Sequence, residues 1–321
     1  MSRRPFNFST FIADKFSVKH WTFLILITFS SCSQNGLKFI KRNPSSVSHM
    51  GCFSAINGFP KEKSYYFGAK RTEPLATFDE QIQVTQFLYG RPGVINRKRE
   101  IRNLSFDELL NYLKEKPIPY VLGPNGMKYI IDRHHFSRSL FELKSELSEK
   151  FGANAKEIKI YFQKVEFDEV NPQDLSDEEF VELMKDNKLT YLKHSNGEIK
   201  PFHKLPLSVG GLEEDYFRGL SWLVRKSGAY KKSDIPFAEF YWGEYLKKNL
   251  SLDKLKYSKK NIRKAIRLAL TFSDEASKLP GFKGAIGMDE LELEDLVKKS
   301  MKKLKKKNLF DLEGLDEEAS V

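Results

Sequence analysis

The chain has 321 residues and a formal net charge of +11, and 40% of its residues are hydrophobic and 13% aromatic. This content of apolar side chains is enough for a sizeable core, which excludes a wholly disordered protein, and the length suits one large domain or a domain with additions. The positive charge favours anionic partners such as nucleotides, nucleic acid or acidic lipid headgroups. The two cysteines, Cys32 and Cys52, lie near the N-terminus, which argues against a disulfide scaffold and a cysteine-ligated zinc site.

Residues 1–32 have the pattern of an export signal. Basic residues precede the apolar run WTFLILITFSS, which is too short to cross a bilayer as a helix and ends in small residues before Cys32. This pattern is similar to a bacterial lipoprotein signal peptide, which implies lipidation of Cys32 and an extracytoplasmic, membrane-anchored protein. An ordinary secretory signal and an uncleaved anchor are alternatives. A start codon placed too far upstream is a third, and it would leave the protein in the cytoplasm.

Three further regions are expected after the signal. Residues 33–70 lack periodicity and are rich in Ser, Asn, Gly and Pro, which predicts an irregular linker. Residues 71–285 are expected to form the folded domain. Residues 286–321 contain the lysine-rich stretch KKSMKKLKKKN and are expected to form a basic helical tail.

The first half of the domain is predicted to contain a helix and a β-hairpin. A helix over 105–116 starts at Ser105, a favoured N-cap residue, and ends before Pro117. Two short apolar segments flank Pro124-Asn125-Gly126, a typical turn sequence, which indicates a hairpin over 120–131.

The remaining pattern is mainly helical. Apolar residues at helical spacing predict a helix over 134–151, and alternation predicts a strand over 157–167. Capping residues and apolar periodicity then predict five more helices, over 176–187, 215–228, 236–249, 252–273 and 288–308. The expected fold class is therefore α+β, with a small sheet around the hairpin and helices wrapped around it.

The candidate functional site lies where the hairpin is followed by a helix, at Asp132-Arg133-His134-His135. The N-terminus of a helix presents unpaired backbone N–H groups and a positive dipole end, which together favour an anion. Arg133, the two histidines and Arg138 add side-chain donors, and Asp132 is predicted to cap the helix and to orient a histidine ring. Phosphate suits these groups best, because arginine binds it through two parallel hydrogen bonds.

Several alternatives compete with this interpretation. One histidine could be a buried structural residue, or the helix start could be a solvated positive end without function. The Asp-x-His-His pattern could belong to a metal site, with His194, His203 or Asp168 as further ligands. The aromatic residues at helical spacing favour a core over a base-stacking platform; they are Trp222, Phe237, Phe240, Tyr241 and Trp242.

The stretch IPYVLGPNGMKYIIDRHHFSRSL resembles the signature of the ParB-like/sulfiredoxin superfamily, and most closely its branch of bacterial ParB-like nucleases. The segments QVTQFLYG, FRGLSWLVRKSGAY, FAEFYWGEYL and ALTFSDEASKLPGFKG also fit, so the resemblance covers about residues 77–285. It implies a ParB-like core with a mainly helical C-terminal part, and it places Thr85 and Gln86 near the site. Arg225 and Glu239 fall in matching segments, where they either line the pocket or pair with each other. No Gly-Gly-Cys precedes the site, so the catalytic cysteine of sulfiredoxin is absent.

Three functional hypotheses follow. The first is a phosphate-handling enzyme, either a nucleotide-dependent phosphotransferase or a nuclease-like phosphodiesterase, with His134, His135 and Asp132 as catalytic residues. The second is a non-catalytic module that binds a nucleotide or another anion at the same place. DNA binding ranks third, because no helix-turn-helix motif is recognisable after the core. A nucleotide cofactor and a divalent metal both stay open, as does contact of the basic tail with an anionic membrane surface.

Overall fold

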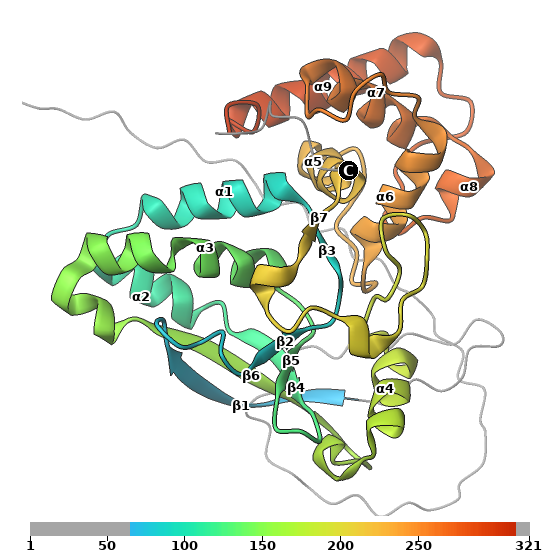
Figure 1. Ribbon diagram of the computed structural model, residues 1–321. Helices are drawn as coiled ribbons and strands as arrows, with labels where there is room; N and C mark the ends of the chain where they lie inside the picture. The colour runs from blue at the N-terminus through green and yellow to red at the C-terminus, as the bar shows by residue number, and fades with distance from the viewer. Residues whose placement is uncertain (1–64, 313–321) are drawn as a thin grey trace, which may run out of the picture. The chain divides into compact units, whose positions relative to one another are not determined.

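Figure 1 shows the computed structural model of the chain, which describes residues 65–312. The expected signal peptide with Cys32, and the expected linker up to residue 64, lie outside the described residues. Within the described part, none of the helices combines the length and the apolar character needed to cross a bilayer.

The centre of the fold is a five-stranded mixed sheet with the strand order β1-β6-β4-β5-β2. β6 lies antiparallel to β1 and parallel to β4, and β5 lies antiparallel to β4 and parallel to β2. The predicted hairpin is confirmed, because Tyr120 of β4 pairs with Ile130 of β5. The strands are β1 Tyr65–Pro74, β2 Ile82–Val84, β4 Ile118–Leu122, β5 Lys128–Ile130 and β6 Lys159–Phe167, with a separate parallel pair formed by β3 Leu88–Tyr89 and β7 Glu213–Glu214.

Helices make up most of the rest of the described chain, so the expected α+β class is confirmed. The capping boxes at Ser105 and Ser176 both form, with Glu108 and Glu179 as their third helical residues. The α-helices are α1 Arg91–Arg102, α2 Phe106–Lys114, α3 His134–Phe151, α4 Asp177–Asp186, α5 Tyr216–Ser227, α6 Ala238–Asn249, α7 Lys259–Leu270, α8 Asp274–Ser277 and α9 Glu290–Lys306. Short 3₁₀ turns are η1 Gly152–Glu157, η2 Pro172–Asp174, η3 Phe202–Lys204 and η4 Val209–Gly211.

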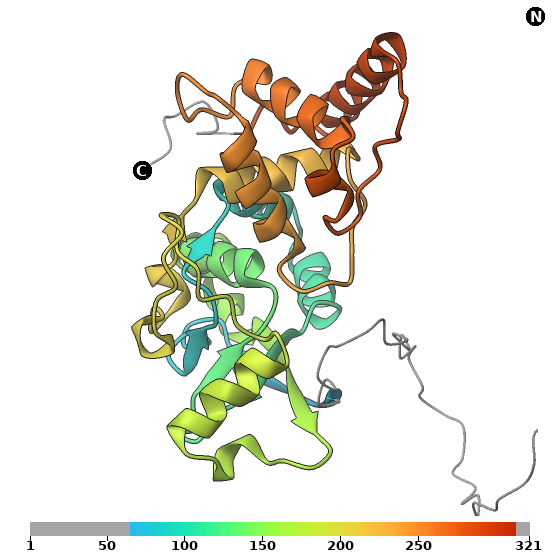
Figure 2. The same ribbon diagram turned by 90° about the vertical axis from the view of Figure 1, so that its right-hand side faces the viewer.

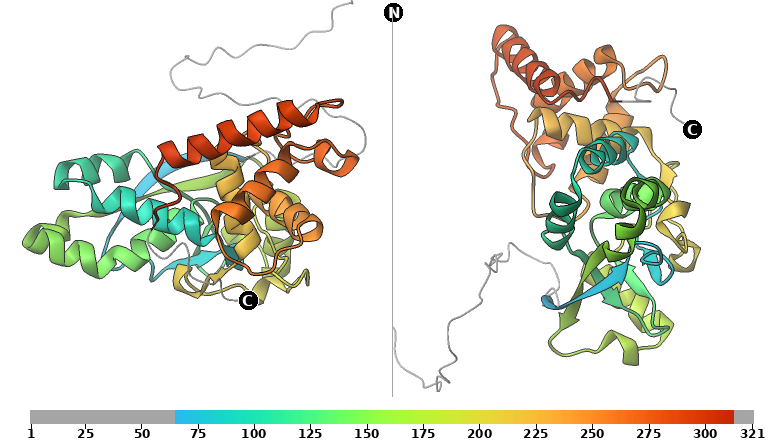
Figure 3. Two further views of the ribbon diagram at one scale, coloured as in Figure 1. Left: turned by 90° about the horizontal axis from the view of Figure 1, so that it is seen from above. Right: turned by 90° about the vertical axis from the view of Figure 1, so that its left-hand side faces the viewer.

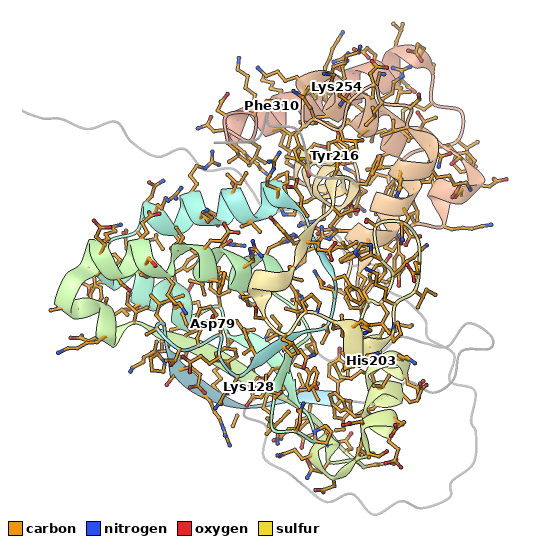
Figure 4. The ribbon with its side chains drawn as sticks, viewed as in Figure 1. Asp79, Lys128, His203, Tyr216, Lys254 and Phe310 are labelled. Carbon is orange, nitrogen blue, oxygen red and sulfur yellow. The ribbon has the colours of Figure 1, made fainter. Side chains whose placement is uncertain are left out.

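The helices form two groups that meet at α1 and α5. In Figure 1, α1 and α3 run side by side above the sheet, and α5, α6, α7 and α9 lie beyond them, an arrangement also seen from the side in Figure 2. α1 packs against both α3 and α5, and α5 packs against α6, α7 and α9. The stick view shows the same division, with Asp79 and Lys128 beside the sheet and Tyr216 and Phe310 among the C-terminal helices (Figure 4).

Each group has its own apolar core. Side chains of the sheet, α2 and α3 form one cluster, and a second cluster joins α5, α6, α7 and α9. A third cluster lies between the sheet and α4, where Tyr129, Phe180 and Phe202 pack their rings together. Because α1 and α5 connect the first two cores, residues at their contact are held between two well-packed bodies.

Two elements, β1 and α1, were not predicted from the sequence. β1 starts at Tyr65, so the linker expected to reach residue 70 is shorter; most β1 side chains are exposed, and the strand therefore lacks an apolar alternation. α1 was missed because Pro92 and Gly93 suggest a loop. Here the proline occupies the first turn of the helix, where it needs no hydrogen bond.

Two predicted helix starts are wrong. α6 begins at Ala238 rather than at Pro236, and its N-cap Phe237 has a left-handed backbone with φ 58°. α7 begins at Lys259, capped by Ser258, and not at residue 252.

The basic tail expected over 286–321 is not separate from the domain. α9 buries Leu293, Val297 and Leu304 in the same core as α5 and α7. Figure 3 shows α9 lying along the other C-terminal helices. The apolar side of α9 is thus occupied by the protein itself, and a lipid-facing helix would have to leave this core.

Candidate functional site

α3 begins with a residue in the left-handed region. Arg133 is its N-cap, with φ 63° and ψ 27°, and no side chain caps the helix. The Asp132 carboxylate accepts a hydrogen bond from Arg133 N at 2.6 Å, one residue too early to cap the first turn. The prediction that Asp132 is the N-cap is therefore wrong. Asp132 is exposed and Arg133 half-buried, so the helix start is accessible from solvent.

His134 joins the start of α3 to the end of β2. Its Nε2 accepts from Thr85 N at 3.4 Å and lies 3.4 Å from Thr85 Oγ1, while Thr85 Oγ1 donates to Ile130 O at 2.8 Å. The side chain is buried, and burial together with the charge of Arg218 lowers the pKa of His134 to about 3. His134 is thus neutral at physiological pH, and it lies next to Thr85 as the family pattern implied.

His135 joins α3 to the start of α1 in a similar way. Its Nε2 accepts from Gly90 N at 2.9 Å, and burial, followed by Arg218, holds the pKa of His135 well below its usual value. A neutral ring whose Nε2 accepts carries its proton on Nδ1. No acceptor for this Nδ1–H is present among residues 65–312. Gly93 allows the close packing, since a Cβ at this position would lie 3.2 Å from Nδ1.

Close to His135, three charged side chains form a buried cluster. Glu239, in the first turn of α6, pairs with both Arg218 and Arg225 of α5. Burial alone would raise the pKa of Glu239, but the two arginines outweigh it and lower the pKa to about 2. Arg218 is almost fully buried, and its Nε has no hydrogen-bond partner in the described part of the chain. Arg225 and Glu239 therefore do pair, which was one of the two alternatives for them.

Arg218 was not predicted as a site residue, although the sequence contains a signal for it. Arg218 and Arg225 are seven residues apart in one predicted helix, so they lie on the same side of it. The partner Glu239 is on a different helix, and only the packing of α5 against α6 brings the three together.

Two of the predicted ligand-binding residues hold the backbone instead. Arg138 donates from Nε to Glu142 at 2.6 Å and from Nη1 to the carbonyls of Val209 and Gly210 at 3.0 and 2.7 Å. These acceptors take the donors that were assigned to an anion, so the geometry does not support an anion clamp at Arg138. Gln86 is buried and donates to Leu88 O at 2.6 Å, which fixes the turn between β2 and β3.

The expected pocket around Asp132–His135 does not coincide with a cavity that the described residues form. A cavity of about 640 Å³ opens between the 191–197 segment, the start of α5, and α6, and none of the residues 132–138 lines it. Arg218 does line it, together with Asp215 and Tyr191. Arg218 therefore lies between the cavity and the two histidines, whose pKa values it lowers.

A metal site of the predicted kind is not formed by the described residues. No group of three His, Cys, Asp or Glu side chains lies there in a position to hold an ion. His194 instead contacts Glu213 at 2.9 Å and Ser195 at 3.2 Å, and His203 is exposed.

The fold and the site together define an α+β domain in which helix starts and a buried Arg-Glu-Arg cluster surround a neutral histidine pair. The family described as "Putative ParB-like nuclease" matches residues 79–248, more than half of the chain, and the protein belongs to this family. The chain is also similar to the crystal structure of protein Atu1540 from Agrobacterium tumefaciens, with 26% sequence identity and a TM-score of 0.53. That match covers 68% of this chain and 98% of the other. No curated protein matches.

Proposed function

We propose that the protein binds a phosphodiester at the start of α3 and hydrolyses it in a nuclease-like reaction. Membership of the ParB-like nuclease family supports the class of substrate. The observation that carries the proposal is the Nδ1–H of His135. Gly90 N donates to Nε2, so the ring proton is on Nδ1, and this donor has no acceptor in residues 65–312. A phosphate oxygen is a suitable acceptor for such a donor.

The state of His135 restricts its chemical role. A neutral imidazole with an occupied Nε2 cannot take a proton from water, so His135 is assigned as a hydrogen-bond donor to the phosphate rather than as a general base. Arg133 adds a positive charge at the same helix start, where the backbone N–H groups also favour an anion. Asp132, exposed beside them, is the carboxylate that would accept the proton of the attacking water as a new phosphorus–oxygen bond forms. The bond to the leaving group breaks, and the leaving oxygen takes a proton from solvent.

A second candidate is binding without turnover. Both histidines are held neutral, and Glu239 is held ionised with its pKa at about 2, so none of the three is tuned to exchange protons near neutral pH. A non-catalytic module that binds a nucleotide or another anion would need only the donors and the charge. Turnover decides between the two candidates.

The test uses a matched pair of substitutions at His135. His135→Gln keeps an acceptor for Gly90 N but removes the Nδ1 donor, whereas His135→Asn keeps a donor near Nδ1 and loses the acceptor. Affinity for a dinucleotide is measured by calorimetry, and hydrolysis is followed with bis(p-nitrophenyl) phosphate. Losing one hydrogen bond to a charged group costs roughly 1.5–3 kcal/mol, so we expect about ten- to a hundredfold weaker binding in His135→Gln.

We expect His135→Asn to bind nearly as well as the native protein and to melt at a lower temperature. Equal affinity of the native protein and His135→Gln, with both folded, would show that the ring is structural. Binding without any hydrolysis by the native protein would support the second candidate.

A further inference from the structure

α9 lies outside the residues that match the ParB-like family, but its charged side chains meet those of the family domain. Lys307 Nζ donates to Lys226 O of α5 at 3.1 Å, and the carbonyls of Lys307 and Asn308 accept from Arg99 of α1 at 3.1 and 2.6 Å. Lys303 reaches the same end of α5, because a Cβ at Gly228 would lie 2.8 Å from its Nζ. Basic side chains of α1 and of the C-terminal part of α9 therefore meet near the end of α5.

These basic side chains crowd one another. Burial lowers the pKa of Lys226 and Arg225 lowers it further, and the smaller effects are a rise caused by Glu100 and a lowering caused by Lys307 and Arg97. The pKa of Lys307 is also lowered, by partial burial and by Lys303 and Arg225. We define the α1–α5–α9 basic surface as Arg97, Arg99, Arg225, Lys226, Lys303 and Lys307.

Carboxylates neutralise only part of this surface, since Glu100 pairs with Arg97 and Glu239 pairs with Arg225. The other four cations form no ion pair within residues 65–312; they are Arg99, Lys226, Lys303 and Lys307. Binding to the C-terminal carbonyls of α5 explains the position of Lys307, since cations are favourable at that end of a helix. It does not explain why Lys226 and Lys303, which form no ion pair in the described residues, lie beside Lys307. Cations that lie this close repel one another, and an anion with several charges would relieve that repulsion.

The surface reaches the first turn of α3, because the guanidinium of Arg97 lies 5.9 Å from the centre of the Phe136 ring. Arg97 lies close enough to Arg133 to lower its pKa, after burial, which is the main cause. Arg225 pairs with Glu239 and acts on the ring of His135. At 1.5 Å per residue α9 is roughly 25 Å long, so a bound chain of phosphates could contact it at several points.

We propose that the α1–α5–α9 basic surface binds the phosphate backbone of a nucleic acid and leads it to the site at Asp132–His135. This proposal rests on the proposed function, because it names the substrate of that site. A nucleic acid fits better than an anionic membrane, since the apolar side of α9 is buried in the protein core and cannot insert into lipid. Contacts of this kind are made to phosphates and carry no sequence preference.

The experiment compares two double substitutions on α9 in the full-length protein. Lys303→Gln with Lys307→Gln removes two charges from the surface. Lys298→Gln with Lys305→Gln removes two charges from the opposite flank of the same helix, because residues at 100° intervals place 298 and 305 there. Binding of fluorescent single-stranded and duplex oligonucleotides is measured by anisotropy at increasing salt concentration.

We expect the first pair to weaken binding roughly tenfold at 0.1 M salt and to reduce the slope of log K against log salt by about 1.5. The second pair should change affinity less than about twofold. If both pairs weaken oligonucleotide binding equally, the effect comes from net charge alone and the proposal is overturned. The proposal is also overturned if neither pair weakens binding. Binding of the native protein to phosphatidylserine vesicles but to neither oligonucleotide would also overturn it.

Hydrolysis of bis(p-nitrophenyl) phosphate distinguishes the proposed basic surface from the proposed phosphate site on which it rests. The small ester does not need the extended surface, so Lys303→Gln with Lys307→Gln should hydrolyse it at the native rate. His135→Gln could hydrolyse the ester and bind a dinucleotide like the native protein, while Lys303→Gln with Lys307→Gln still binds oligonucleotides more weakly. That result would contradict the proposed phosphate site and support the basic surface.

Discussion

His134 and His135 are adjacent in the chain, but their two rings have different partners. Both accept a backbone N–H through Nε2, from Thr85 and Gly90 respectively. The ring of His134 also makes a hydrogen bond to the backbone of Ile130, which raises its pKa slightly against the larger effect of burial. His135 has no corresponding partner in the described residues. His134 thus ties the start of α3 to Thr85 and Ile130, and the Nδ1–H of His135 is the donor that we propose for a ligand.

The depressed pKa of His134 predicts a pH dependence of stability. The unfolded ring has a pKa near 6.5 and the folded ring one of about 3, so its contribution is fully present above pH 6.5 and is lost as the pH falls toward 3. For one such group the loss between pH 8 and pH 5 is about 2 kcal/mol. Urea unfolding at these two pH values should show this loss in the native protein and a smaller one in His134→Gln. Identical pH dependence in the two proteins would contradict the assignment.

At the scale of elements, α3 and α6 share an unusual start. Arg133 and Phe237, their N-caps, both have left-handed backbones, a conformation that costs about 1–2 kcal/mol for a residue with a side chain. Arg133 also has its guanidinium partly desolvated. Strain of this kind is often kept at functional sites, and here it turns the chain so that the start of α3 faces solvent.

Substitutions of Arg133 test its left-handed backbone conformation and its positive charge separately. Glycine adopts the left-handed conformation without a steric cost, so Arg133→Gly should be as stable as the native protein or about 0.5–1 kcal/mol more stable. Its affinity for a dinucleotide should fall about tenfold, because the positive charge is lost. Arg133→Lys serves as the control and should retain most of the affinity. Thermal unfolding and calorimetry measure both effects. Loss of stability in Arg133→Gly would show that the side chain, and not the turn, is what the fold requires.

α9 provides a second prediction at this scale. Leu304 is fully buried against the C-terminal core, so Leu304→Ala should lower the free energy of unfolding by about 2–5 kcal/mol. Lys306→Ala, at an exposed position of the same helix, should change it by less than about 0.5 kcal/mol. Chemical denaturation of the two variants gives the comparison. A small effect of Leu304→Ala would instead indicate a helix that leaves the core easily, as a membrane-binding tail would.

At the scale of the whole molecule, the described domain and the proposed export signal have to be compatible. A nuclease-like protein outside the cytoplasm would act on nucleic acid from other cells, and the basic surface is suited to this because it recognises phosphates rather than sequence. The apolar run that ends at Cys32 lies outside the described residues, so export stays a proposal.

Mass spectrometry of the mature protein tests it. We expect an N-terminus at Cys32 that carries lipid, and recovery of the protein in the membrane fraction. Cys32→Ser should release the protein from that fraction without changing its oligonucleotide affinity, since the site lies in residues 65–312. A soluble native protein that still starts at Met1 would rule out the lipoprotein signal.

The features that could be read from sequence alone are local ones. The turn at Pro124–Gly126 and the capping boxes at Ser105 and Ser176 depend on residues a few positions apart, and the structure contains all three. The hairpin and the start of the helix after it, where the site is proposed, could be predicted for the same reason. β1 could not, because an exposed edge strand is stabilised by its pairing with β6 and not by an apolar pattern of its own.

Only the tertiary structure decided what the charged and polar side chains do. Arg138 looked available for an anion until the carbonyls of the 209–212 segment, about seventy residues away, were seen to bind it. Glu239 meets Arg218 and Arg225 because α6 packs on α5, and His135 is neutral because packing buries its ring and brings Arg218 near it. Hydrogen bonds and pKa values depend on which groups meet in space, and for these residues that is set by packing between elements distant in the chain.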